Sequence, residues 1–461
     1  MGLFRTDLAK PIAWPPPGSA AGVAATLRYA RLRDPIGHRV HGVLAAAHVL
    51  TLPLSTAGSS LTFALLVGYA VLRLPNTWRC YTALLRVPIV WALALWTAWM
   101  ALSLTWSADP RQGFEELWTM RMILLLPALW PVLELAPWLI GAALVGVACQ
   151  QVAQLLQYTE IFSLRPQDPP GRFGGWIHPI QTGAWCVGAM CWHVAAILTG
   201  RGRLRWLSLA GLALAALGLL ATQSRGPWLA AAIALPAALL IIPLRRPRTW
   251  RAAVILAVAG IVAAAAVWPI FSGPVTARVQ QAVDDYQAAR DEGIYHTNIG
   301  LRIGQWRWTW AIFTEAPING TGAGGFRHAQ NDQPLFRQAI DRWPKKADDM
   351  ARDHPHNTTL YILATTGLIG GLIVLAAIAL ALRAAGRDRP DHPYADGTIF
   401  LLIAWLIGGQ FDCYNLNGHL LGMFMLAVAV TLPRRDAVRG WSFRRPAAAG
   451  EAGAATLEED G

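Results

Sequence analysis

Two histidines and an asparagine, His354, His356 and Asn357, stand immediately before a long apolar run in the stretch DHPHNTTLYILATTGLIGG at residues 353–371. An imidazole can accept a proton near neutral pH, and an amide can orient a neighbouring group through hydrogen bonds. Neither group helps a helix to insert into lipid. These side chains are therefore candidates for chemistry at the entrance of a membrane span, and a histidine that only caps the helix is the plain alternative.

Three arginines also lie beside apolar segments: Arg172 in GRFGGWIHPIQTG, Arg225 in SRGPWLA and Arg302 in LRIGQWRWTW. Guanidinium groups bind phosphate oxygens in pairs and keep their charge near neutral pH. Arginines that converge beside one imidazole indicate a lipid diphosphate substrate at the membrane surface. Two plain alternatives stay open, since Arg225 can extend to the interface and Arg302 can stack on the neighbouring indoles.

The acidic residues do not form a convincing divalent-metal motif. The pairs Asp284–Asp285 and Asp348–Asp349 each fall on a charged, helix-like stretch and are more typical of solvated surface than of a metal site. The sequence also lacks the P-loop, GxSxG and HExxH motifs. We therefore expect no metal, nucleotide or other cofactor at the site.

The elements that must position these residues are membrane helices. Of the 461 residues, 54% are hydrophobic and 14% are charged, with a mean hydropathy of +0.37, which is too apolar for one soluble core. The sequence predicts an all-α polytopic membrane protein with about twelve spans. These spans are placed at residues 42–58, 60–75, 87–106, 118–136, 137–157, 179–200, 206–223, 227–244, 250–271, 355–382, 397–411 and 417–433.

The distribution of basic residues predicts the orientation. Successive loops between the predicted spans lie alternately on the two sides of the membrane, and the candidate site residues all fall on one side. More than half of the 39 Lys and Arg residues fall on the other side, which includes both termini. By the positive-inside rule, both termini are cytoplasmic and the site faces the opposite side. The net charge of +12 is then a topology signal, and we expect no nucleic-acid partner.

Four segments make up the predicted organisation. A cytoplasmic N-terminal segment covers residues 1–41, and a transmembrane domain covers residues 42–433. A large, mostly helical outer loop at residues 272–353 lies between the ninth and tenth spans. Residues 434–461 are a cytoplasmic tail whose composition is typical of disorder.

The arginine and histidine motifs, together with GLRIGQWRWTWAIFTEAPINGTGAGGF in the large loop, resemble the family of O-antigen ligases and O-antigen polymerases. The resemblance implies a multi-pass bacterial inner-membrane glycosyltransferase with a GT-C-like architecture and a periplasmic active site. It also implies transfer of a glycan from undecaprenyl diphosphate without a metal or nucleotide. In that pattern His356 is the catalytic base, Arg225 and Arg302 hold the donor with Arg172, and Asn357 and His354 are possible orienting or acceptor contacts.

Several functions fit this resemblance. The chain length favours an O-antigen ligase, whose partners are the undecaprenyl-diphosphate-linked O-antigen, a lipid A-core acceptor and membrane lipids. An O-antigen polymerase or a protein O-oligosaccharyltransferase would use the same site. A flippase or transporter would place polar groups near the middle of the spans, and an assembly partner without catalysis would tolerate replacement of the arginines and His356.

Overall fold

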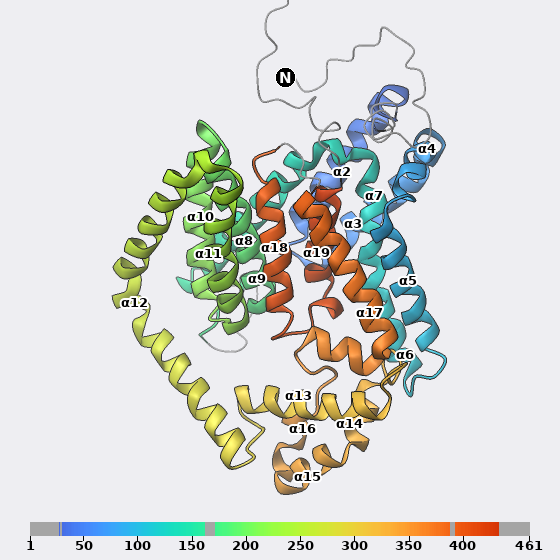
Figure 1. Cartoon of the computed structure of the whole chain (residues 1–461), viewed down its shortest axis with the longest axis vertical. Helices are drawn as coiled ribbons and strands as arrows, with labels where there is room; N and C mark the ends of the chain where they lie inside the picture. The colour runs from blue at the N-terminus through green and yellow to red at the C-terminus, as the bar shows by residue number, and fades with distance from the viewer. Residues whose placement is uncertain (1–26, 28–29, 162–170, 388–391, 433–461) are drawn as a thin grey trace, which may run out of the picture.

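The structure is a computed structural model that describes residues 27, 30–161, 171–387 and 392–432. Its described residues form helices and contain no strand (Figure 1). The predicted tail at 434–461 and most of the N-terminal segment at 1–41 lie outside the described residues. The fold class is therefore all-α, as the composition predicts.

The principal helices, in chain order, are α2 (Pro35–Thr51), α3 (Thr56–Leu72), α4 (Leu74–Leu84), α5 (Pro88–Ser103), α6 (Pro110–Thr119), α7 (Leu125–Leu129), α8 (Ala136–Tyr158), α9 (Pro179–Thr199), α10 (Arg203–Ala221), α11 (Arg225–Arg245), α12 (Trp250–Asp291), α13 (Asn298–Glu315), α14 (Phe326–Asp332), α15 (Pro334–Arg342), α16 (Ala347–Met350), α17 (Thr358–Arg387), α18 (Ala395–Gly408) and α19 (Gly418–Thr431). Within the described residues, five short 3-10 segments connect some of these helices: η1 (Met120–Leu124), η2 (Trp130–Leu135), η3 (Pro247–Thr249), η4 (Pro344–Lys346) and η5 (Tyr414–Leu416).

The membrane character of the described chain rests on six helical runs that are long and apolar enough to cross a bilayer, or seven if the bent pair α3 and α4 counts as one. The shorter helices α5, α18 and α19 are also apolar. Every predicted span contains helix, but residues 42–58 include the break between α2 and α3, and residues 118–136 do not form one regular helix. They divide into η1 (Met120–Leu124), α7 and η2 (Trp130–Leu135), because Pro127 and Pro131 lack the backbone donors of a regular helix.

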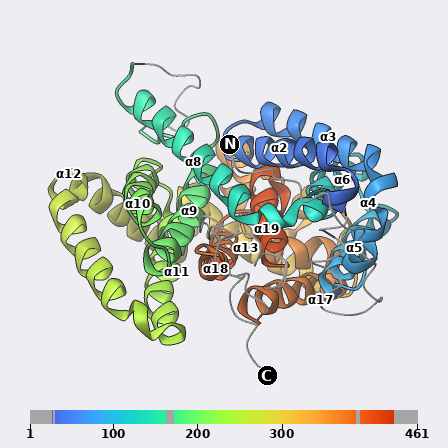
Figure 2. The same ribbon diagram turned by 90° about the horizontal axis from the view of Figure 1, so that it is seen from above.

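Helix α9 forms the centre of the bundle, between α10, α11 and α18 (Figure 2). Its large side chains Trp185 and Trp192 are fully buried. Small residues let the neighbours approach closely: a Cβ on Gly183 would lie 2.9 Å from Pro227 at the start of α11. This packing fixes the first turn of α11, which carries Arg225.

Helix α12 continues through the predicted end of the membrane span at residue 271 and reaches Asp291. The first part of the predicted outer loop is thus the second half of this 42-residue helix. Figure 1 shows α12 at the margin of the bundle, with its C-terminal end beside α13. The remaining loop forms α13 to α16 and covers one end of the bundle, which we call the loop end.

Helix α17 is broken at Gly367, whose φ of +65° is in the left-handed region. A side chain at this position would collide with the Ile318 carbonyl. The backbone groups around the break bond instead to the glycine-rich turn of the loop, where Thr321 and Gly322 donate to the carbonyls of Ala364 and Thr365 at 2.9 Å. The break therefore holds the first two turns of α17 in place at the loop end.

Candidate active site

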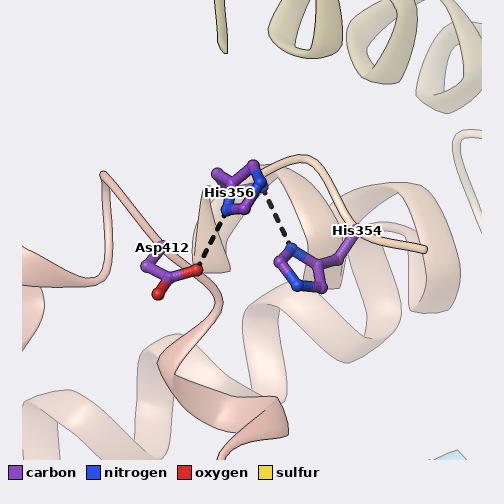
Figure 3. Close-up of side chains that lie close together, drawn as sticks. All are labelled: His354, His356 and Asp412. Atoms are coloured by element: carbon purple, nitrogen blue, oxygen red, sulfur yellow. Dashed lines mark hydrogen bonds and ion pairs between the residues drawn. The ribbon is translucent and has the colours of Figure 1, made fainter. Parts of the chain in front are cut away.

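His356 lies directly beside a carboxylate that the sequence analysis did not select (Figure 3). Its Nδ1 is 3.2 Å from Oδ1 of Asp412, in the turn that follows α18. His354 lies on the other side of His356, and its Nδ1 accepts a hydrogen bond from the His356 backbone N–H at 3.4 Å. The Asp412 carboxylate bonds to the His356 ring, whereas the hydrogen bond from His354 holds the His356 backbone.

Asn357 accounts for the helix cap, so His356 is not needed for that purpose. The Asn357 Oδ1 accepts from the Leu360 N–H at 2.9 Å, and its Nδ2 donates to the Gln410 carbonyl at 3.2 Å. His356 has a φ of +52°, a conformation that is uncommon outside glycine. The cap and this turn direct the His356 ring away from the helix and towards Asp412, which excludes the plain capping alternative for His356.

The Asp412 carboxylate is held in its charged form. Burial raises its pKa, but the hydrogen bond and charge of His356, followed by the charge of His354, outweigh burial and hold the pKa at about 2. The Cys413 backbone N–H also donates to Oδ1 at 2.9 Å. The hydroxyl of Thr358 donates to the Asp412 carbonyl at 3.0 Å, which fastens this turn to the first residue of α17.

The three predicted arginines line one pocket of about 140 Å3 with Asp412, although they come from separate parts of the chain. Arg172 precedes α9, Arg225 is the first residue of α11, and Arg302 lies in α13. A fourth arginine, Arg278 of α12, lines the same pocket. The structure thus gathers all three sequence candidates and adds one that the sequence analysis missed.

Arg172 and Arg225 bond to neutral oxygens. Arg172 donates to the Thr222 carbonyl at 3.1 Å and to the Ser224 hydroxyl at 2.7 Å. Arg225 donates to the Arg278 carbonyl at 2.8 Å, so its guanidinium group is held against α12 and does not simply extend to the membrane interface.

Arg302 makes no hydrogen bond, ion pair or ring contact within the part of the chain that the structure describes. The α13 arginine that stacks on a ring is instead Arg307, whose guanidinium lies 5.9 Å from the ring centre of Tyr295. The stacking alternative for Arg302 is therefore not observed.

The pocket is strongly cationic. Burial, followed by the charges of Arg278, Arg302 and Arg225, lowers the pKa of Arg172 to about 10, and the group stays protonated near neutral pH. Burial also lowers the pKa of Arg302, against the nearby charge of Asp412. One carboxylate faces four guanidinium groups, so the pocket is suited to an anion with several oxygens.

His354, His356 and Asp412 also have the spacing of a metal site, because one ligand atom from each lies within 4.8 Å of the others. The guanidinium groups around Asp412 oppose a divalent cation there.

Of the two aspartate pairs of the loop, Asp284, Asp348 and Asp349 are exposed, as expected, and Asp285 is buried. Asp349 pairs with Lys346 at 3.1 Å, whereas Asp285 is buried and accepts from the Ile299 N–H at 3.1 Å. The expectation that Asp285 is solvated was wrong, since it caps the start of α13.

Both missed residues left a signal in the sequence. Asp412 directly follows the predicted span at 397–411, on the same face as the other candidates. Arg278 stands in VTARVQQ, a pattern typical of a solvated helix, and only the course of α12 brings it to the pocket.

Comparison with protein families shows that residues 210–375 match the family described as O-antigen ligase. The resemblance noted in the sequence is thereby confirmed. The matched segment contains Arg225, Arg278, Arg302 and the two histidines, and it excludes Arg172 and Asp412. No curated protein matches the chain.

Proposed function

From the O-antigen ligase domain that this chain contains, we propose that the protein is a membrane glycosyltransferase acting on undecaprenyl-diphosphate-linked O-antigen. It transfers the polysaccharide to lipid A-core oligosaccharide at the periplasmic face of the bacterial inner membrane. Transfer inverts the anomeric configuration and uses no metal or nucleotide.

The observation that carries this proposal is the arginine pocket. Arg302 makes no hydrogen bond or ion pair among the described residues, and Arg172, Arg225 and Arg278 line the same pocket. A diphosphate offers the several charged oxygens that four guanidinium groups require. As the bond from sugar to phosphate breaks, negative charge grows on the leaving diphosphate, and fixed guanidinium groups stabilise it.

His356 supplies the base. Its Nδ1–H donates to Asp412, which leaves Nε2 free to accept a proton. The acceptor hydroxyl gives its proton to Nε2 while its oxygen bonds to the anomeric carbon, and the bonding electrons of the broken bond go to the diphosphate. Attack from the side opposite the leaving group inverts the anomeric carbon.

The periplasmic placement is supported by the basic residues. They concentrate in the segments remote from the arginine pocket, which the positive-inside rule assigns to the cytoplasm. The lipid diphosphate would then be bound at the outer surface of the inner membrane.

The deciding experiment supplies purified protein with undecaprenyl-diphosphate glycan and lipid A-core, in excess EDTA and without nucleotide. We expect glycan to appear on the lipid A-core with inverted linkage. The glycan that remains on the carrier should not grow in length. Loss of transfer in EDTA, with recovery on adding a divalent ion, would instead assign His354, His356 and Asp412 to a metal. Growth of carrier-linked chains would identify a polymerase.

A further inference from the structure

A second cavity, of about 320 Å3, lies on the other side of the α18 end from the arginine pocket. We call it the apolar groove; it lies among α5, α17, α18 and α19. Its walls include Leu93, Trp96, Ile362, Leu375, Trp405 and Phe424. The two cavities are neighbours at the end of α18, where Gly408 lines the arginine pocket and the next residue, Gly409, lines the groove.

The groove follows α17, and part of its wall is exposed on the surface of the protein. Its α17 wall extends from Ile362 past the break at Gly367 to Ile378. Leu372 and Leu375, which line it, expose 63% and 60% of their surface. An elongated apolar slot with an exposed wall suits a hydrocarbon chain and offers little to a sugar.

The rim of the groove is polar and is joined to the candidate base. Thr358, Thr359 and Gln410 lie at this rim, and the Gln410 amide donates to the Thr359 hydroxyl at 3.0 Å. Thr358 follows His356 by two residues and donates to the Asp412 carbonyl. A lipid whose chains fill the groove would therefore present its polar head close to His356.

We propose that the apolar groove binds the acyl chains of the acceptor glycolipid, an inference that rests on the proposed function. The donor's polyprenyl tail is covalently attached to the diphosphate in the arginine pocket, so it leaves on that side of α18. In an inverting reaction the acceptor hydroxyl approaches from the side opposite the diphosphate. An acceptor anchored in the bilayer then needs a separate place for its hydrocarbon, and the groove provides it next to the base.

A kinetic experiment tests this assignment with Leu372→Trp and Leu375→Trp, which fill the groove from its exposed wall. The matched control is Leu95→Trp on α5, because Leu95 is 56% exposed and does not line the groove. We expect the KM for acylated lipid A-core to rise about tenfold in the groove variants, the equivalent of a few lost methylene contacts. The KM for the donor, and transfer to core oligosaccharide without acyl chains, should stay at the control values.

A labelling experiment on the wild-type protein does not depend on turnover or on the folding of variants. Lipid A-core with a photoreactive group in its acyl chains should label residues 368–378 of α17, and a donor analogue with the same group in its polyprenyl chain should not. Labelling by the donor analogue, or a rise in donor KM alone, would assign the groove to the donor and overturn this inference while the proposed function stands. Transfer that fails in the wild type would overturn the proposed function, and absence of acyl labelling would overturn the inference by itself.

Discussion

The two ends of the bundle both carry arginines in partly or fully buried positions, and the arginines differ in their partners. At the end remote from the loop, Arg73 lies 2.9 Å from Asp34, and Arg246 lies 2.7 Å from Asp396. At the loop end, Arg172 and Arg225 bond to neutral oxygens, and Arg302 bonds to nothing among the described residues.

The difference separates structural charges from binding charges. Breaking a buried ion pair leaves an uncompensated charge and destabilises the fold, and a charge already paired with a carboxylate has little left to offer a ligand. A group of arginines that exceeds the nearby carboxylates keeps a positive potential until an anion arrives. The loop end is therefore the end at which substitutions should alter catalysis, and the other end is where they should alter stability alone.

The largest effect is expected from removing His356, the proposed base. His356→Ala should lower transfer by roughly 10²–10⁴-fold, because the acceptor proton loses its destination. His354→Ala is the matched control, since His354 contacts the His356 backbone and does not bond to Asp412. Turnover in vesicles, normalised to inserted protein, measures both; equal loss in the two variants would contradict the assignment of His356.

Exchanging arginine for lysine at each end tests the comparison directly. Arg302→Lys and Arg225→Lys should raise the donor KM and lower the rate by roughly 10- to 100-fold, because lysine cannot reproduce paired hydrogen bonds to phosphate.

Arg73→Lys at the other end is the matched control. It should lower the melting temperature, since Arg73 is 3% exposed and paired with Asp34, yet leave the donor KM unchanged. A control variant that changed the donor KM as much as the Arg302 variant would remove the distinction between the ends.

A smaller effect is expected at Asp412. Asp412→Asn keeps the shape of the side chain but replaces the carboxylate beside His356 Nδ1 with a neutral amide, which forms a weaker hydrogen bond to the ring. The maximal rate should fall by about tenfold, because the amide holds the imidazole less firmly in position. Turnover in vesicles, normalised to inserted protein, measures this loss; a wild-type rate would show that Asp412 does not act through the imidazole.

The smallest effect concerns stability in acid. Burial, and then the charge of His356, lowers the pKa of His354 from the ordinary 6.5 to about 4. The unfolded chain therefore takes up this proton first, and stability is lost as the pH falls from 6.5 towards 4. The melting temperature of the wild type should fall more between these values than that of His354→Asn; parallel curves would contradict this account.

His356 and the three arginines could be selected from the sequence because each lies beside a strongly apolar segment, and the structure places the arginines in one pocket with Asp412, the neighbour of His356. The sequence could not predict the partner of His356, since Asp412 is distant in the chain and reaches the histidine only because α18 ends where α17 begins. Hydropathy predicted that the apolar span ends near residue 271, but it could not predict where helix α12 ends. The helix continues to Asp291 because the polar sequence beyond the span contains alanine and glutamine, which favour helix.

Helix α12 has a consequence for hydrogen exchange. Only 11% of its most apolar membrane-spanning window is buried by protein, and Ile255, Ile261 and Val262 expose between 61% and 70% of their surface. Lipid therefore protects the first half of this helix, whereas the half that carries Arg278 extends beyond the apolar window and is held mainly by its contacts with α11 and α13. We expect amides of residues 275–291 to exchange faster than those of α9, and a bound diphosphate to slow them by linking Arg278 to the other arginines.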